Sequence, residues 1–255
     1  MVRRGLVSSR GEAQEAVRSG AVTVSGAPAT KPATLVAADA PVRIVGEARR
    51  FVSRGGEKLD AALRRFDLDP DGLDCLDAGA STGGFTDRLL QGGARRVAAV
   101  DVGYGQLAWS LRQDERVVVI ERTNARDLSI GDLPFAPALV VADLSFISLR
   151  RVLPALALVS SARADGVFLV KPQFEAGPAD VGRGGVVRDP AVWARVLCEV
   201  VEAAAAGGFA PQGLMASPLR GPAGNVEFLL WGRKGAASVE LDVDAAVAEG
   251  REVAS

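Results

Sequence analysis

The sequence predicts an α/β fold in which helices cover a mostly parallel, doubly wound sheet with an antiparallel final strand, preceded by a small α+β unit. From Leu73 onward, short apolar runs alternate with segments of helical periodicity, which is typical of parallel sheets. The segment "SPLRGPAGN" is too short for a crossover helix, so the two strands that it joins are expected to pair antiparallel. The first 48 residues lack this alternation and contain one short helix followed by turn-rich strands.

The composition narrows the possible functions. The chain has 255 residues, 48% of them hydrophobic, which suits one large or two modest domains. No apolar run is long enough to cross a bilayer, and the N-terminus lacks the apolar stretch of a signal peptide, so we expect a cytoplasmic protein without a membrane partner. Two cysteines and no histidine predict neither a disulfide framework nor a metal site. Any general base must then be Lys, Asp, Glu, Cys or the single Tyr104.

The charge is unevenly distributed along the chain. The net charge is −1, but residues 1–65 contain 12 Lys and Arg against 6 Asp and Glu. A basic first quarter on an acidic body indicates contact with a polyanion, although a merely solvated basic face would look the same.

The first region, residues 1–48, has a recognisable order of elements. Ser9-x-x-Glu12 is a capping-box pattern for a helix that should run to about Ser19 and stop at Gly20. A short strand, "AVTVSG", then turns at Ser25-Gly26. This succession resembles the small S4-like RNA-binding domain of ribosomal proteins and pseudouridine synthases. The usual opening helix is absent, so either the start of the sequence is misplaced or the module is shortened there. The resemblance implies an RNA-facing surface at these residues: Arg4, Ser9, Arg10, Gln14 and Lys31.

Residues 49–59 are predicted to form a linker and the start of a helix. Ser53 is expected to cap this helix, which carries Lys58 and turns apolar residues such as Leu59 and Leu63 toward a core. Residues 60–255 should form the second domain. Its strands are predicted at 73–78, 97–101, 117–120, 138–142, 166–170, 211–216 and 226–231, and its helices near 84–92, 105–112, 148–158 and 190–206.

The strongest local signal is "CLDAGASTGGFTDRLL", in which a strand runs into a glycine-rich turn and a helix. Such a turn lets the backbone approach a ligand, and Asp101, at the end of the next strand, has the spacing of a residue that binds ribose hydroxyls. The glycine spacing fits neither the usual dinucleotide loop nor a P-loop. It resembles motif I of S-adenosylmethionine methyltransferases, which implies this cofactor and the following contacts: Asp77, Gly79, Ala80, Ser81, Thr82, Gly83, Gly84, Phe85, Asp101, Val102, Asn124, Arg126 and Asp143. Asn124 and Arg126, expected near the adenine, could equally belong to an ordinary turn.

Four charged residues stand at the expected ends of strands or helices. Asp143 and Lys171 follow neighbouring strands, Glu227 opens the last strand and Lys58 lies on the helix before the sheet. Their order resembles the Lys-Asp-Lys-Glu tetrad of FtsJ-type RNA ribose 2′-O-methyltransferases. In this chemistry Lys171 would accept the hydroxyl proton or stabilise the developing alkoxide, Asp143 would orient Lys171, and Glu227 would orient Lys58 or a water. Each residue also has a simpler interpretation as part of a structural ion pair or a solvated surface.

Other methylation chemistries are less well supported. Base-amino methyltransferases usually have Asn/Asp-Pro-Pro-Tyr/Phe where this chain has Asp143-Leu144-Ser145-Phe146. Cytosine C5 methylation needs a cysteine beside the cofactor, whereas Cys75 and Cys198 are expected to be small core residues in a strand and a helix.

The whole series of motifs, among them "SRGGEKL", "DAGASTGGFTD", "ADLSFISL", "LVKPQFEAG" and "SPLRGPAGNVEF", is similar to the TlyA family. This resemblance implies an rRNA cytidine-2′-O-methyltransferase that acts on assembled ribosomal subunits, on 23S and in longer members also on 16S rRNA. Members are often labelled haemolysins, so a membrane-active protein is one alternative and a non-catalytic RNA-binding protein is another. The absence of a long apolar or strongly amphipathic basic helix disfavours the first, and the intact tetrad disfavours the second.

Overall fold

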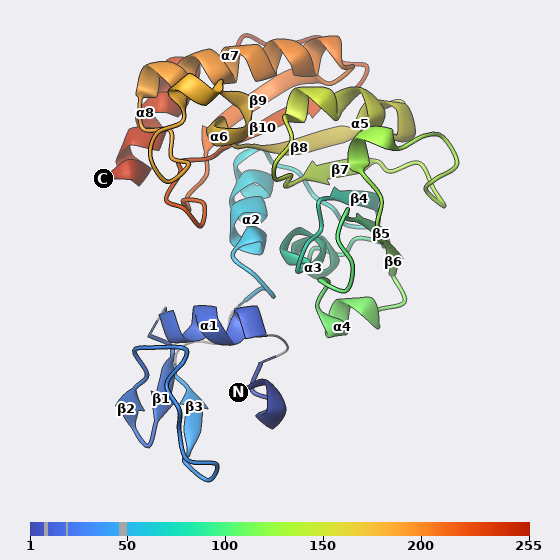
Figure 1. Ribbon diagram of the computed structural model, residues 1–255. Coiled ribbons are helices and arrows are strands. Elements are labelled where there is room, and N and C mark those ends of the chain that lie inside the picture. The colour runs from blue at the N-terminus through green and yellow to red at the C-terminus, as the bar shows by residue number, and fades with distance from the viewer. Residues whose placement is uncertain (8–9, 19, 46–49) are drawn as a thin grey trace. The chain divides into compact units, whose positions relative to one another are not determined.

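The computed structural model describes residues 1–7, 10–18, 20–45 and 50–255 of the chain. The chain forms two compact units, Met1–Arg50 and Phe51–Ser255. Figure 1 shows the elements of each unit.

The smaller unit has a three-stranded antiparallel sheet with a helix. A 3₁₀ turn at Val2–Arg4 precedes α1 (Arg10–Arg18), and the sheet has the order β2-β1-β3. Its strands are β1 (Val22–Val24), β2 (Ala27–Pro28) and β3 (Val42–Ile44). The helix stop at Gly20 is confirmed, because Gly20 has a φ of 73° and its N–H donates to the carbonyl of Val17. Ser9, the expected cap of this helix, lies outside the described residues.

The larger unit is a seven-stranded sheet in the order β6-β5-β4-β7-β8-β10-β9. β10 runs antiparallel to both of its neighbours, and the other strands are parallel to one another, as the sequence predicts. The strands are β4 (Asp74–Ala78), β5 (Arg96–Val100), β6 (Val117–Ile120), β7 (Leu139–Ala142), β8 (Asp165–Val170), β9 (Ala210–Ala216) and β10 (Phe228–Arg233). The helices are α2 (Gly55–Arg65), α3 (Gly84–Gln91), α4 (Trp109–Arg112), α5 (Leu153–Val159), α6 (Pro172–Glu175), α7 (Pro190–Ala206) and α8 (Val243–Ala254).

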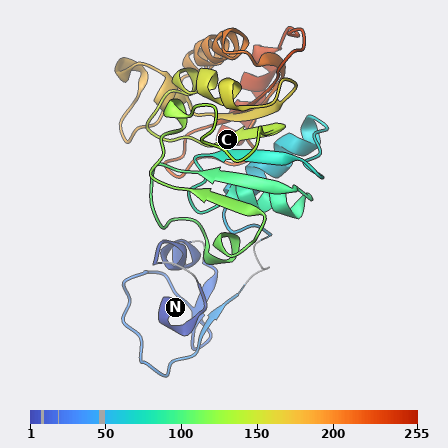
Figure 2. The ribbon, with the colours of Figure 1, turned by 90° about the vertical axis from the view of Figure 1, so that its right-hand side faces the viewer.

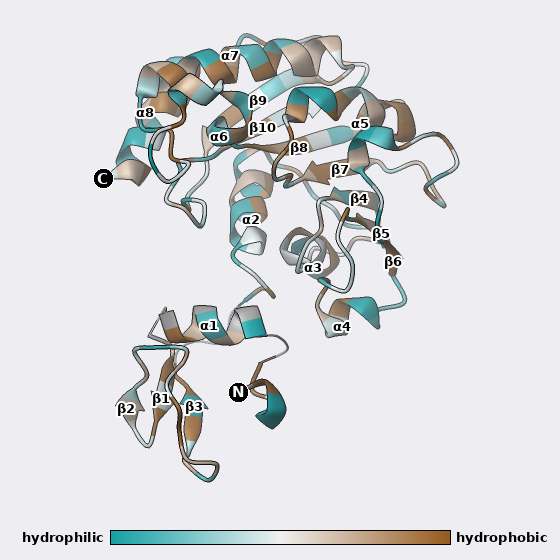
Figure 3. Cartoon of the chain, in the orientation of Figure 1, coloured by the Kyte–Doolittle hydropathy of each residue, from teal (hydrophilic) through white to brown (hydrophobic). Residues whose placement is uncertain are grey.

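Apolar side chains cover both faces of this sheet. Because side chains alternate along a strand, Leu76 of β4 packs into a core with α5, α7 and α8, whereas its neighbour Cys75 packs into a second core with α2 and α3. Figure 2 shows α7 and α8, in orange and red, on one side of the strands, and Figure 3 shows the apolar character of β5, β6 and β7. Two buried faces explain why these strands appear in the sequence as continuous apolar runs.

The strand order places a crevice beside β4. The chain moves outward from β4 to β5 and β6, then returns to the other side of β4 at β7. In open α/β sheets, ligands bind outside the carboxyl ends of the strands at such a reversal. A ligand is therefore expected beside the segments that follow β4, β5, β7 and β8.

Three local expectations are wrong. Arg54, not Ser53, stands at the N-cap of α2, and no side chain caps that helix. The helix expected at 105–112 is reduced to Trp109–Arg112, because Gly105 has a φ of 71° and donates its N–H to the Glu121 carboxylate. Cys198 is exposed on α7 rather than buried.

Candidate active site

The turn after β4 is shaped by close backbone contacts. Gly79 has a φ of 86°, and a Cβ atom there would lie 2.5 Å from the carbonyl oxygen of Asp143. The amides of Gly79 and Ala80 donate to the carbonyl of Val100, at 2.8 and 3.1 Å. A side chain at Gly79 would therefore push the end of β4 away from the segment after β7.

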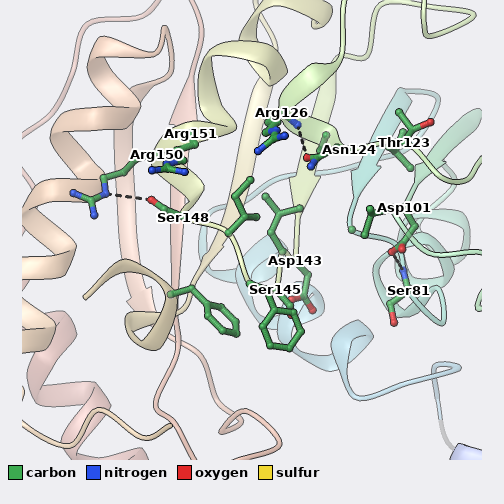
Figure 4. A pocket seen from close by; sticks show the side chains of 18 of the residues that line it. Ser81, Asp101, Thr123, Asn124, Arg126, Asp143, Ser145, Ser148, Arg150 and Arg151 are labelled. Carbon is green, nitrogen blue, oxygen red and sulfur yellow. Dashed lines mark hydrogen bonds between the residues drawn. The ribbon is translucent and has the colours of Figure 1, made fainter. Parts of the chain in front are cut away.

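A cavity of about 930 Å³ opens at this edge of the sheet. Figure 4 shows side chains from the segments after β4, β5, β6 and β7 around it. Seven of the expected cofactor contacts line the cavity: Gly79, Ser81, Asp101, Val102, Asn124, Arg126 and Asp143. The shared crevice brings together residues that are 64 positions apart in the chain, as expected for a site at a sheet reversal.

The Asp101 carboxylate, which lines this cavity, bonds to two backbone amides. It accepts a hydrogen bond from the amide of Ser81 at 2.8 Å and another from the amide of Gly103 at 2.6 Å. Figure 4 shows the Asp101 carboxylate pointing toward the backbone of Ser81. Asn124 caps a 3₁₀ turn at Ala125–Asp127, because its side chain accepts from the amide of Arg126. Asn124 therefore has the turn role and also lines the cavity.

The other expected contacts do not line this cavity. Gly83 and Gly84 instead allow α3 to pack closely, since a Cβ at Gly83 would lie 2.2 Å from Leu111 and one at Gly84 would lie 2.2 Å from the hydroxyl of Ser53. Phe85 is buried in the core formed by α2 and α3. Thr82, Ala80 and Asp77 are likewise outside the lining.

Asp77 is fully buried beneath the glycine turn. Its Oδ2 accepts from the amide and the hydroxyl of Thr86, at 2.9 and 2.7 Å, whereas its Oδ1 has no hydrogen-bond partner. Burial raises the pKa of Asp77 to about 7, and the charges of Asp143 and Asp101 act in the same direction. The two hydrogen bonds of Asp77 to Thr86 hold the end of β4 against the first turn of α3.

Lys171 forms an ion pair with Asp143, which lines the cavity. The Lys171 ammonium lies 2.6 Å from Asp143 Oδ1 and donates to the Ser145 hydroxyl at 3.0 Å. Asp143 and Ser145 both line the cavity (Figure 4), and the backbone amide of Asp143 donates to the carbonyl of Ala78 at 3.0 Å. The lysine at the end of β8 is thus held by the segment that follows β7.

A second pair lies in the same region. Lys58 of α2 is hydrogen-bonded to Glu227, and their side chains are only 8% and 1% exposed. Phe228 of β10 pairs with Val170 of β8, so Glu227 and Lys171 are the next residues beyond that pair. The four residues therefore form two ion pairs, Lys58–Glu227 and Asp143–Lys171, at one edge of the sheet.

Phe146 is a cavity residue that the sequence pattern does not indicate. Its side chain is 91% exposed and its φ is 64°, which is uncommon for a residue other than glycine. Its ring lies 5.2 Å from that of Phe174, and both line the cavity. An exposed aromatic ring at the cavity suits contact with a flat ligand. A Ser-Phe pair after a strand carries no periodic signal, so only the structure identifies it.

The expected RNA contacts lie in the smaller unit. The Arg4 guanidinium donates to the carbonyls of Ala37, Ala38 and Ala40, so it also fixes a loop of its own unit. Arg10, Gln14 and Lys31 are exposed and line, with Arg4, a cavity of about 960 Å³ within this unit. Ser9 is outside the described residues.

The fold and the site define an S-adenosylmethionine-type methyltransferase of the Rossmann-like class. Solved structures of very different sequence share this fold, such as an S-adenosylmethionine-dependent methyltransferase of Mesorhizobium loti, with 17% identity and a TM-score of 0.51 over 69% of this chain and 98% of that one. The family model for FtsJ-like methyltransferases matches residues 51–234, and the model for S4 domains matches residues 1–42.

Individual relatives narrow the assignment. The 16S/23S rRNA (cytidine-2′-O)-methyltransferase TlyA of Mycobacterium tuberculosis is 55% identical over 91% of this chain and 87% of its own length. Hemolysin A of Brachyspira hyodysenteriae is 39% identical over 88% of this chain and 94% of its own. A solved structure of a Streptococcus thermophilus hemolysin candidate has 39% identity and a TM-score of 0.82, covering 98% of this chain and 93% of that one. The chain belongs to the TlyA family, and in it an S4 domain precedes an FtsJ-like methyltransferase domain.

Among the described residues, no helix is long and apolar enough to cross a membrane.

Proposed function

We propose that this protein transfers a methyl group from S-adenosylmethionine to the ribose 2′-hydroxyl of cytidine in ribosomal RNA. The observation that carries the proposal is the 2.6 Å contact between Lys171 and Asp143 beside the cavity at the glycine turn. The names of the relatives from M. tuberculosis and Campylobacter jejuni support cytidine as the target, with 23S rRNA common to both and 16S rRNA in the first only. We propose 23S rRNA in the large subunit as substrate, and 16S rRNA as a second.

The residues present fit the cofactor. Gly79, where a Cβ atom would obstruct the turn, and Ser81 would lie beside its methionine part, Asp101 would bind the ribose hydroxyls, and Asn124 and Val102 would lie beside the adenine. When bound, the cofactor supplies a methyl group activated by the positive charge on sulfur. The protein's remaining task is to place a ribose oxygen and to manage its proton.

Lys171 is proposed to take that proton. A neutral amine at Nζ accepts it as the hydroxyl oxygen becomes a nucleophile, and Asp143 orients the nitrogen and balances the resulting ammonium. The ammonium of Lys58, paired with Glu227, supplies a fixed positive charge that favours negative charge on the ribose oxygen. Positioning contributes a large share of the rate in reactions of this kind.

Phe146 is proposed to hold the target base. RNA bases outside a helix are commonly stacked on aromatic side chains, and this ring is exposed beside the cavity. Replacing Phe146 with Ala should lower kcat/KM by a factor equivalent to roughly 1–3 kcal/mol of transition-state stabilisation, while Phe146→Trp should retain most of the wild-type kcat/KM. Because the ring is exposed, neither change should lower stability much.

The N-terminal region, residues 1–48, is proposed to bind the rRNA. Its match to the S4 model and the exposed Arg10 and Lys31 support this division. Binding that depends on such residues should weaken as salt rises.

The test is methylation of purified 30S and 50S subunits with labelled S-adenosylmethionine, followed by mass spectrometry of the modified nucleotides. We expect abundant 2′-O-methylcytidine with the wild type and only a small, measurable residue of it with Lys171→Met. Arg163→Ala is a matched control, since this exposed residue precedes β8 at the opposite edge of the sheet. Modification of a base, or full activity of Lys171→Met, would contradict the proposal. Leakage of liposomes by the same protein would instead support a membrane-active role.

A further inference from the structure

Asp143 and Ser145 both contact the side-chain nitrogen of Lys171. The Lys171 ammonium lies 2.6 Å from Asp143 Oδ1 and 3.0 Å from Ser145 Oγ, and both acceptors come from the segment just after β7. Figure 4 shows the side chains of Asp143 and Ser145 close together at the cavity. We propose that Ser145 is a positioning residue, which together with Asp143 aims the Lys171 nitrogen at the ribose hydroxyl. This inference rests on the proposed function.

The geometry of an amine explains why a second acceptor matters. A neutral lysine nitrogen carries two N–H bonds and one lone pair, arranged tetrahedrally with the bond to Cε. One acceptor leaves the group free to rotate about the Cε–Nζ bond, because any of its hydrogens can satisfy that acceptor. Two acceptors at different positions engage both hydrogens, so the lone pair has a single remaining direction.

The same arrangement works in either protonation state. In the ammonium form, one N–H bond points to Ser145 and a second side of the nitrogen faces Asp143 Oδ1, 2.6 Å away, so the remaining N–H bond points where the lone pair pointed before. When the hydroxyl proton passes to Nζ, the O–H bond breaks and the lone pair becomes this third N–H bond. The new N–H bond is then directed at the oxygen it came from, where it can stabilise negative charge.

The surroundings hold Ser145 in place. On its N-terminal side, Asp143 is fixed by the hydrogen bond that its backbone amide donates to the Ala78 carbonyl and by the close approach of Gly79. On its C-terminal side, Phe146 has a left-handed φ of 64° and packs against Phe174, whose ring centre lies 5.9 Å from the Lys171 nitrogen. The segment therefore presents both acceptors to Lys171 from a constrained backbone.

The experiment compares Ser145→Ala and Ser145→Thr with the wild type, using methylation of 50S subunits. Losing the acceptor should lower kcat about 10- to 100-fold, since a small misplacement of a reacting group has effects of this size. The KM for subunits and the Kd for S-adenosylmethionine should stay within about twofold, because Ser145 is proposed to act through Lys171 alone. Ser145→Thr keeps the hydroxyl and should recover most of the lost kcat.

Two further variants separate the possible failures. Ser238→Ala is the matched control, because Ser238 is exposed and follows β10 at the opposite edge of the sheet. In a Lys171→Met background, Ser145→Ala should have no further effect, since the nitrogen it positions is gone. An unchanged kcat for Ser145→Ala, a raised KM alone, or a Thr variant as impaired as Ala would overturn the positioning role while leaving the proposed function intact. Absence of ribose methylation by the wild type would overturn the proposed function itself.

Discussion

The Lys58–Glu227 pair offers a test of whether this ion pair is required for catalysis or only for stability. Both side chains are almost completely buried, with 8% and 1% exposure. Removing one partner of a buried pair leaves an uncompensated charge and costs about 3–5 kcal/mol. We therefore expect Lys58→Met and Glu227→Met each to destabilise the larger unit by about this amount. For a unit of this size, that corresponds to a fall in Tm of roughly 6–20 °C.

The double variant makes the test sharper. With both charges replaced by methionine, no charge remains buried, and apolar replacements of similar volume are often neutral for stability. The double variant should thus be more stable than either single variant. Methylation should be lost in all three variants. Lys58→Met and the double variant lack the positive charge proposed to lie beside the ribose oxygen, and in Glu227→Met that charge has lost the partner that holds it in place.

Unfolding can be followed by tryptophan fluorescence in urea. Trp109, Trp193 and Trp231 are the only tryptophans in the sequence, and all lie within Phe51–Ser255, so the signal reports on the larger unit. Single variants that lose less than about 1 kcal/mol would show that the charges are solvated rather than buried. A double variant that regains methylation would show that the pair is structural only.

Three other predictions follow from individual contacts. Burial raises the pKa of Asp77 from 3.8 to about 7. The contribution of this group to the stability of the free protein should therefore be greatest below pH 4 and should fall as the pH rises to 7. Asp77→Asn should remove this pH dependence from a series of Tm measurements. Glu249 of α8 accepts from the amide of Ala216 at 3.0 Å, so Glu249→Ala should destabilise the larger unit by about 1–3 kcal/mol in urea unfolding, with Glu240→Ala as an exposed control. Replacing Arg10 or Lys31 with Ala should weaken subunit binding and lower the slope of log affinity against log salt by about 1 each, without altering cofactor affinity.

The approximate positions of the strands were predictable from the sequence, for a specific physical reason. Strands buried on both faces are continuous apolar runs, and β6 and α7 have the predicted bounds, Val117–Ile120 and Pro190–Ala206. The short connection before β10 also predicted its reversed direction correctly. Helix ends were less predictable, because Gly105 and its bond to Glu121 shorten α4 in a way that no local pattern indicates.

The site was predictable in its residue types but not in its contacts. That Lys171 meets Asp143 follows from adjacent parallel strands, and the structure has that contact. The partner of Glu227 was left open between Lys58 and a water, and the structure pairs it with Lys58 across 169 positions of sequence. Ser145 and Phe146 were not identified, since their roles depend on a loop conformation and on exposure, which a single sequence does not reveal.

The two ion pairs differ in a way that supports the proposed roles of the two lysines. In the Lys58–Glu227 pair, called the sealed pair here, the Glu227 side chain is only 1% exposed. In the Asp143–Lys171 pair, the open pair, the Asp143 side chain is 26% exposed and lines the cavity. A group that takes a proton must reach the substrate oxygen and must tolerate a change in its own charge during the reaction. A sealed pair tolerates such a change poorly, because a lone buried charge is costly, while the cavity beside Asp143 can solvate it. The open pair therefore suits proton transfer by Lys171, and the sealed pair suits Lys58 as a charge that stays constant throughout the reaction.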